Sequence, residues 1–447
     1  MMLDRLACDR ARRSRDARFD GRFFIGALDT GGVDQLADRL GLTARHLRRL
    51  FVQHLGATPL QVALTRRAHF AKKLIDETRL PFGQVAIAAG FGSLRRFNAQ
   101  IKRTYKRTPG ELRRLARQKT IRTNLKVCPH VMECYRFRLS YRPPYDWDAI
   151  LAFLSARATP GVESVTAASY RRTITAGGQH GSIAVSHSAS GPALDLEVRF
   201  PDPRSLLLIV ERVRRIFDLG ADPAVIAEHL GADPLLRKPM AAHPGLRTPG
   251  AWDPFELSVR AIIGQQISVR GATTMAGRVA AMFGAPAEPG DLDRLFPTPV
   301  QLSDAPIERA GLIPARAQAI RALAQGVLDG SIALTAGTDT ASLTTLPGIG
   351  DWTAQYIAMR AFGEPDAFPS GDLILRRAAG CPTARALERR SESWRPWRAY
   401  AVMLLWQAAG DERTHSRRTA HAQATTRSSR PDGARRLPAG VAAHGAG

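Results

Sequence analysis

Residues 346–354, Leu-Pro-Gly-Ile-Gly-Asp-Trp-Thr-Ala, decide the fold of the C-terminal half of this 447-residue chain. An apolar helix end, a turn with two glycines and an immediate second helix predict a helix-hairpin-helix. Gly348 and Gly350 permit the positive φ and the close backbone approach that this turn needs. The N–H groups of the turn and of the next helix start, including that of Thr353, are expected to bind an anion such as a backbone phosphate. A hairpin that only shapes the fold is the alternative.

A carboxylate follows the hairpin. Asp372 stands at the start of the amphipathic segment 373–380, Leu-Ile-Leu-Arg-Arg-Ala-Ala-Gly. An aspartate in this place can cap a helix, and that structural task alone would account for it. The same carboxylate can stabilise positive charge that develops on a bound substrate. Asp366, four residues after the preceding helical segment, is the competing candidate.

Two aromatic residues lie just past the hairpin turn. Trp352 and Tyr356 are four residues apart and therefore share one face of the predicted helix. Packing in the core is the ordinary role of such rings. Their place directly after the phosphate-binding turn strengthens the alternative of a binding pocket.

The basic residues are concentrated in the N-terminal part of the chain. Residues 1–126 hold 28 of the 64 Lys and Arg side chains but only 10 of the 40 Asp and Glu side chains. A net charge of +24 gathered in this way indicates a nucleic-acid-binding module joined to a nearly neutral remainder. The apolar fraction of 44% indicates a globular protein with real hydrophobic cores.

The basic region repeats one pattern: a short apolar helix, a glycine turn and a capped basic helix. Thr43 and Ser93 are the predicted N-caps. The apolar Leu94, Phe97 and Ile101 are expected to point inward. Two such units predict a double helix-turn-helix with recognition helices for adjacent major grooves, and a basic solvent-facing bundle is the alternative. The side chains expected to face DNA are Arg45, Arg48, Arg49, Arg95, Arg96 and Asn98.

The middle of the chain predicts a small antiparallel sheet with covering helices. Apolar and polar residues alternate in four runs, which are residues 136–141, 170–176, 181–188 and 193–200. The fold class is therefore mainly α with an α+β subdomain. The predicted divisions are residues 1–31, a helix-turn-helix domain at 32–115, a linker at 116–130, an α+β subdomain at 131–245, a helical domain at 246–410 and a disordered basic tail at 411–447.

Three stretches resemble the AlkA-type DNA-3-methyladenine glycosylases of the helix-hairpin-helix superfamily. They are residues 141–165, 212–223 and the hairpin-to-aspartate segment 346–372. The resemblance implies that the protein flips an alkylated purine out of duplex DNA and hydrolyses its N-glycosidic bond. It assigns Asp372 to the stabilisation of an oxocarbenium-like sugar. It also implies a base pocket of aromatic residues that would hold a cationic base, formed by Trp352, Tyr356, Trp406 and Phe153, with Arg157 at its border.

The resemblance also defines the reaction subclass. Glycosylases that cut the strand carry a Schiff-base lysine where this chain has Trp352, so a monofunctional hydrolase is implied. The closely spaced cysteines of iron–sulfur relatives are missing from the sequence. The duplex plug falls on Gln266, a poorer apolar wedge than is usual, and Leu373 replaces a pocket aromatic of some members. Both departures affect the expected substrate range.

Residues 32–115 resemble the AraC-type DNA-binding domain of Ada-like alkylation-response regulators, most clearly over 84–114. Residues 15–32 are similar to the opening of the Ada zinc domain, which accepts methyl groups. Because no cysteine lies between Cys8 and Cys128, that domain is expected to be truncated and its chemistry lost. Cys128 and Cys134 flank His130, but free thiols are favoured over a metal site because no second ligand pair has zinc-like spacing.

The sequence therefore predicts a DNA-repair glycosylase fused to an AraC-type DNA-binding domain. A transcriptional regulator with a non-catalytic glycosylase-like half is the alternative. We expect double-stranded DNA with alkylated bases as partner, a monomer, and no cofactor beyond a monovalent cation that the hairpin could bind. The longest apolar run, 399–410, is too short to span a bilayer, and the first residues lack a signal-peptide pattern. A cytoplasmic, nucleoid-associated protein is expected.

Overall fold

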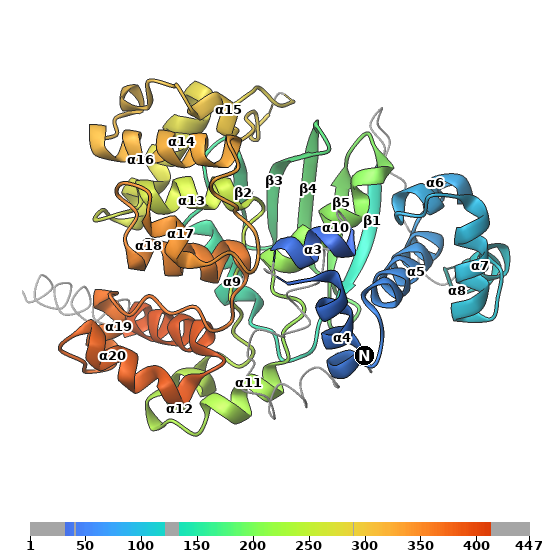
Figure 1. Ribbon diagram of the computed structural model, residues 1–447, viewed down its shortest axis with the longest axis horizontal. Coiled ribbons are helices and arrows are strands. Elements are labelled where there is room, and N and C mark those ends of the chain that lie inside the picture. The colour runs from blue at the N-terminus through green and yellow to red at the C-terminus, as the bar shows by residue number, and fades with distance from the viewer. Residues whose placement is uncertain (1–31, 40–41, 121–133, 289, 413–447) are drawn as a thin grey trace, which may run out of the picture.

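The computed structural model describes residues 32–39, 42–120, 134–288 and 290–412. The predictions for residues 1–31, for Cys128 and His130 and for nearly all of the tail lie outside this range. Two groups of helices form the N-terminal region (Figure 1). Thr43 accepts a hydrogen bond from the His46 N–H, and Ser93 accepts one from the Arg96 N–H, so both predicted caps are confirmed. The helices are α3 (Val33–Arg39), α4 (Ala44–Leu55), α5 (Pro59–Glu77), α6 (Phe82–Ala88), α7 (Leu94–Tyr105) and α8 (Pro109–Thr120).

One side chain of this region departs from the prediction. Leu94 is 47% exposed, whereas Phe97 and Ile101 are fully buried. Leu94 is the first residue of α7, where the helix projects past the core that its later turns cover. The inward face of α7 therefore begins at Phe97.

The central sheet is antiparallel, with the strand order β1-β5-β4-β3-β2. The four predicted strands are confirmed, and the alternation of β1 buries Tyr135, Phe137 and Leu139. A fifth strand, β2, has only three residues and was not predicted. The strands are β1 (Cys134–Ser140), β2 (Glu163–Val165), β3 (Ser169–Ala176), β4 (Gln179–His187) and β5 (Ala193–Arg199). Apolar residues of α9 (Trp147–Ser155) and α10 (Leu206–Ile216) pack against this sheet, and Asp146 caps α9.

The second half of the helix-turn-helix region packs directly on the edge strand of this sheet. Helix α5 lies beside β1 in Figure 1, and the rings of Phe70 and Phe137 are 6.2 Å apart. Lys73 donates a hydrogen bond to the Arg138 carbonyl, and the Arg138 N–H donates to the Glu77 carboxylate over 3.1 Å. These side chains satisfy backbone groups at the free edge of the sheet, where unpaired groups would otherwise invite association. One hydrophobic core therefore extends across both units.

The remaining helices share a second core, and the C-terminal half is helical as predicted. Among the buried residues of this core are Leu257, Ile320 and Ile357. This core also includes Ile226, Leu230 and Leu236, which the sequence assigned to the α+β subdomain. The helices are α11 (Pro223–Leu230), α12 (Pro234–Ala242), α13 (Pro254–Ile263), α14 (Val269–Phe283), α15 (Pro299–Leu302), α16 (Pro314–Leu328), α17 (Thr340–Thr344), α18 (Asp351–Ile357), α19 (Leu373–Ala378) and α20 (Ala384–Arg390), with a π turn, η3 (Ala358–Phe362), after α18 and 3₁₀ turns η1 (Pro203–Ser205), η2 (Ile307–Ala310) and η4 (Ser391–Trp394). Residues 398–412 are helical as well.

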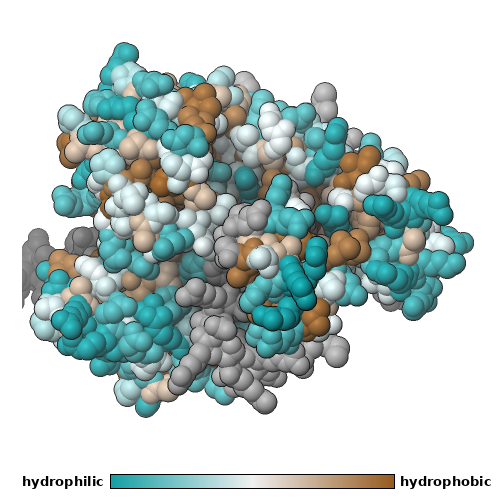
Figure 2. All heavy atoms as spheres, in the orientation of Figure 1, coloured by the Kyte–Doolittle hydropathy of each residue, from teal (hydrophilic) through white to brown (hydrophobic). Residues whose placement is uncertain are grey.

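The molecule is thus mainly α with one small sheet, as the sequence predicted. Hydrophilic side chains gather over α7 and α8 and over the region of α12, α19 and α20 (Figure 2). Among the described residues, no helix has the length and apolarity needed to cross a membrane.

Candidate active site

Asp372 is the N-cap of α19, and three N–H groups donate to its carboxylate. The Leu375 N–H donates to Oδ1 over 2.9 Å, which is the capping hydrogen bond. The indole Nε1–H of Trp352 donates to Oδ2 over 3.1 Å, and that of Trp406 donates to Oδ1 over 3.3 Å. Hydrogen bonds to both oxygens hold the carboxylate in one orientation. The helix-capping role and a charge-stabilising role therefore coexist in one half-buried side chain.

The predicted aromatic residues surround this carboxylate. The rings of Trp352 and Tyr356 stack with 5.3 Å between centroids and 9° between planes. Trp406 comes from the last described helix, and its ring lies 6.3 Å from Tyr356. All three rings are half-buried, so part of each remains accessible. The structure thus brings together side chains that are far apart in the sequence.

Tyr356 lies in a strongly positive environment. The Arg360 guanidinium donates a hydrogen bond to its hydroxyl over 2.8 Å. Burial raises the pKa of Tyr356, but the charges of Arg360, Arg157 and Arg260 outweigh burial and leave that pKa below its ordinary value. Sequence reasoning did not identify Arg360 as part of the site, although it stands four residues after Tyr356 on the same helical face.

Phe153 reaches the site from α9 of the sheet subdomain. The Arg157 Cζ lies 3.7 Å from the Phe153 ring centroid, and the Arg360 Cζ lies 4.6 Å from it. Phe153 is therefore connected to Tyr356 through Arg360. Its predicted place at the border of the pocket is compatible with this arrangement, although guanidinium groups already contact its ring.

The hairpin joins α17 to α18 through residues 345–350. Gly348 has a φ of +77°, as predicted, but Gly350 has a φ of −89° and is the extended N-cap of α18. The expectation that both glycines need positive φ is therefore wrong for Gly350. The first helical hydrogen bond of α18 runs from the Ala354 N–H to the Gly350 carbonyl, so the N–H groups at 351–353 have no partner within the helix.

The Thr353 side chain is turned into the protein. It is 3% exposed, and its hydroxyl accepts a hydrogen bond from the Gln265 Nε2 over 3.0 Å. Gln265 also donates to the Gly348 carbonyl over 2.8 Å. Only the backbone N–H of Thr353 is therefore left for a phosphate. Gln265 ties the hairpin to the loop that follows α13, a contact that the sequence did not reveal.

Gln266, the predicted duplex plug, follows on this same loop. It is exposed and has a φ of +56°, which is unusual for a residue other than glycine. Its neighbours Ile267 and Val269 are 38% and 43% exposed. The loop thus presents one amide and two apolar side chains next to the hairpin.

Comparisons with known proteins show the family to which this chain belongs. Residues 136–253 match the family model of the AlkA N-terminal domain, and residues 36–115 match that of a helix-turn-helix domain. The "Probable bifunctional transcriptional activator/DNA repair enzyme AlkA" of Mycobacterium tuberculosis is 40% identical over 395 residues, which are 85% of this chain and 77% of that protein. The chain belongs to the AlkA family of DNA glycosylases.

Two further proteins support the assignment of the AlkA half. DNA-3-methyladenine glycosylase 2 of Escherichia coli is 33% identical over 281 residues, covering 61% of this chain and 98% of that protein. The structure of a 3-methyladenine DNA glycosylase from Archaeoglobus fulgidus superimposes with a TM-score of 0.53 at 21% identity, over 61% of this chain and 98% of the other. The second likeness concerns the fold alone.

Asp366, the competing carboxylate of this AlkA-family protein, is held in ion pairs. Arg398 Nε lies 2.7 Å from its Oδ1, and Arg395 contacts its Oδ2. These contacts give Asp366 a structural role between the end of η3 and the last described helix. Leu373, directly after Asp372, is 52% exposed. Its aliphatic side chain adds no aromatic surface to the site.

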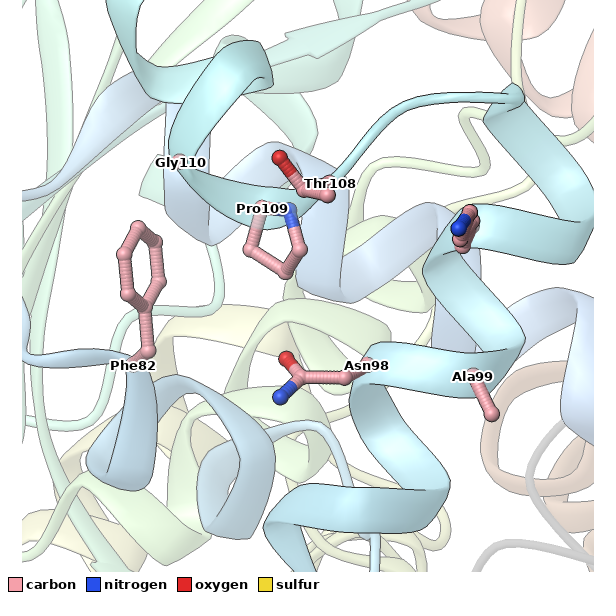
Figure 3. Close-up of a pocket in the computed structure, with 7 residues that line it drawn as sticks. Phe82, Asn98, Ala99, Thr108, Pro109 and Gly110 are labelled. Carbon is pink, nitrogen blue, oxygen red and sulfur yellow. The ribbon is translucent and has the colours of Figure 1, made fainter.

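The predicted DNA-facing side chains of the helix-turn-helix domain are exposed. They lie on two helices, with Arg45, Arg48 and Arg49 on α4 and Arg95, Arg96 and Asn98 on α7. Asn98 also lines an open hollow of about 330 Å³ between α6, α7 and α8, toward which Phe82 and Pro109 point as well (Figure 3). Their contacts with DNA remain a prediction.

Proposed function

We propose that this protein releases alkylated purines, chiefly 3-methyladenine, from duplex DNA by hydrolysing the N-glycosidic bond. The observation that carries this proposal is the Asp372 carboxylate, which accepts hydrogen bonds from both Trp352 and Trp406 beside Tyr356. A fixed negative charge thus stands next to a set of accessible aromatic faces. The names of the bacterial relatives support the same substrate class.

The chemistry begins with a nucleotide turned out of the duplex, because a stacked base cannot reach a half-buried carboxylate. Alkylation at N3 or N7 gives the purine a positive charge, which favours stacking on indole and phenol rings. As the bond from C1′ to the base breaks, its electron pair leaves with the base and positive charge develops on the sugar. Asp372 stabilises that charge electrostatically until water adds to C1′ and loses a proton.

Hydrolysis without strand cleavage follows from the identity of residue 352, two positions after Gly350. Trp352 occupies the place where a Schiff-base lysine would be needed, and its indole carries no nucleophilic amine. The indole instead donates to Asp372. We therefore propose a monofunctional enzyme.

The other predicted elements complete the proposal. The N–H groups at the start of α18 would bind a phosphate, and Gln266 would fill the gap in the duplex. A monovalent cation, the one cofactor we propose as possible, would be held by hairpin carbonyls such as those of Leu346 and Gly348, each of which accepts one hydrogen bond and has a second lone pair. The helix-turn-helix domain would bind DNA and serve transcription regulation. We propose that the protein works as a monomer on chromosomal DNA.

The replacement Asp372→Asn tests the catalytic assignment. Asparagine also caps helices, so the fold should be kept while the charge is lost. We expect base release from dimethyl-sulfate-treated duplex DNA to fall by about a hundredfold to a thousandfold. Asp366→Asn is the matched control, because it removes a carboxylate that is bound in ion pairs outside the pocket.

The outcomes separate the candidate functions. Equal release by the wild type and Asp372→Asn would refute the role of this carboxylate. Absence of release from the wild type, together with promoter binding by the N-terminal domain, would favour a regulator with a non-catalytic glycosylase-like half. Loss of release in the Asp366→Asn variant alone would transfer the catalytic role to the competitor.

A further inference from the structure

Arg360 is a buried cation at the base of the aromatic cluster. Its side chain is 4% exposed and lies on the π turn η3, one helical turn after Tyr356. Within the part of the chain that the structure describes, no carboxylate forms an ion pair with it. Burial lowers the pKa of Arg360 to about 10.

The guanidinium of Arg360 contacts three separate segments. Nη1 donates to the Tyr356 hydroxyl over 2.8 Å, Nη2 donates to the Gly250 carbonyl over 3.3 Å, and Nε donates to the Pro249 carbonyl. The guanidinium also lies 4.6 Å from the Phe153 ring centroid. One planar group therefore joins the pocket tyrosine, the segment before α13 and the sheet subdomain.

This arrangement is poorly explained by stability. A buried charge with no carboxylate at ion-pair distance destabilises a fold, and an apolar side chain of similar volume would avoid that penalty. The π turn is a further local departure from regular helix, and such turns often accompany functional sites. What the guanidinium does supply is a rigid fork of donors that holds several acceptors at fixed angles.

We propose that Arg360 is a positioning residue, whose hydrogen bond to the Tyr356 hydroxyl fixes the Tyr356 ring against Trp352 and so sets the aromatic surface that receives the flipped base. This inference rests on the proposed glycosylase function. The hydroxyl oxygen is the only polar atom of the phenol, so its bond to Arg360 fixes the far end of the ring, and stacking on Trp352 sets the plane of the ring. The ring is 9° from parallel with Trp352, which in turn donates to Asp372.

The test is a double-mutant cycle on base release. Tyr356→Phe removes the acceptor and keeps the ring, and Arg360→Met removes the donor and keeps much of the volume. If the two residues act through one hydrogen bond, each single variant should lose about tenfold in kcat/KM on dimethyl-sulfate-treated duplex DNA, and the double variant should lose little more. Lysine can still donate to the Tyr356 hydroxyl, so Arg360→Lys should be more active than Arg360→Met when Tyr356 is present. In the Tyr356→Phe background, where the hydroxyl is missing, Arg360→Lys and Arg360→Met should be equally active. Arg360→Lys also serves where Arg360→Met does not fold.

Arg247→Lys is the matched control. Arg247 is 1% exposed and donates to the Arg142 and Pro144 carbonyls, over 2.6 Å and 3.0 Å, without contacting the pocket tyrosine. Its replacement should show no coupling with Tyr356→Phe. Losses that multiply to about a hundredfold in the double variant of Arg360 and Tyr356 would overturn the positioning role while leaving the proposed function intact. Absence of release from the wild type would instead refute the proposed function itself.

Discussion

The catalytic pocket and the helix-turn-helix surface both face DNA in the proposed function, but they are built in opposite ways. In the pocket, Asp372, Trp352 and Trp406 are half-buried, and both indoles donate hydrogen bonds to the Asp372 carboxylate. On α4 and α7, the predicted DNA-facing residues are exposed and mostly basic. Chemistry therefore depends on a few mutually dependent groups, whereas binding is distributed over many replaceable ones. Single substitutions should separate the two regions, with Asp372→Asn producing the largest effect.

The support beneath the pocket should be the next most sensitive feature. Glu163 on β2 and Glu256 on α13 form buried ion pairs with Arg172 and Arg260, which join the sheet subdomain to the helical half. Removing one carboxylate leaves a buried guanidinium uncompensated. We expect Glu163→Gln to lower the free energy of unfolding by about 3 kcal/mol in urea titrations.

The same network predicts an acid dependence. Burial raises the pKa of Glu163, but Arg260 and Arg172 outweigh it and lower that pKa to about 2. Because the folded pKa is below the ordinary value of 4.5, this stability is complete above pH 4.5 and is lost as the pH falls toward 2. The less buried pair of Glu197 with Arg136 is the control, and Glu197→Gln should cost below about 1 kcal/mol. Similar losses in both variants would show that burial does not distinguish them.

The indole donors should produce a smaller effect on catalysis. Trp352→Phe keeps an aromatic face but removes the N–H that donates to Asp372, and we expect kcat/KM for base release to fall about tenfold. Trp394 offers a matched control, because its indole donates to Asp233 over 2.7 Å outside the pocket. Trp394→Phe should lower stability and leave release per folded molecule unchanged. If both variants lost release equally, the indole bond to Asp372 would have no special role.

The sequence predicted those parts of the site that are encoded locally. The hairpin turn, the capping aspartate and the pair of aromatics one helical turn apart lie within residues 346–372, where spacing determines their relation. Gln265 escaped prediction because its partner Gly348 is 83 residues away, and the contact of Arg360 with the Pro249 carbonyl escaped because it spans 111 residues. No local pattern distinguishes such side chains from ordinary polar residues.

The same reason explains what was missed in the fold. Strand β2 has too few residues to show an alternation, and the exposure of Leu94 depends on where the surrounding core ends. The packing of Phe70 on Phe137 joins two segments on either side of the predicted linker. The polar composition of that linker indicated separate units, whereas packing of α5 on β1 decides that they share a core.

The smallest effect is expected on the helix-turn-helix surface. Replacing both Arg95 and Arg96 with alanine should weaken duplex binding only modestly and uniformly, because each arginine is one of many cations facing the phosphates. The logarithmic salt dependence of the binding constant should become shallower by about 0.9 for each phosphate that the variant no longer neutralises. Base release at saturating enzyme should stay the same, since α7 contributes nothing to the pocket.

Arg204, which is 74% exposed on η1 and paired with Asp202, is the control, and Arg204→Ala should leave the slope unchanged. A variant of Arg95 and Arg96 that lost release while keeping its salt slope would show that α7 acts on the pocket through the shared core of α5 and β1, and the division between concentrated chemistry and distributed binding would then fail.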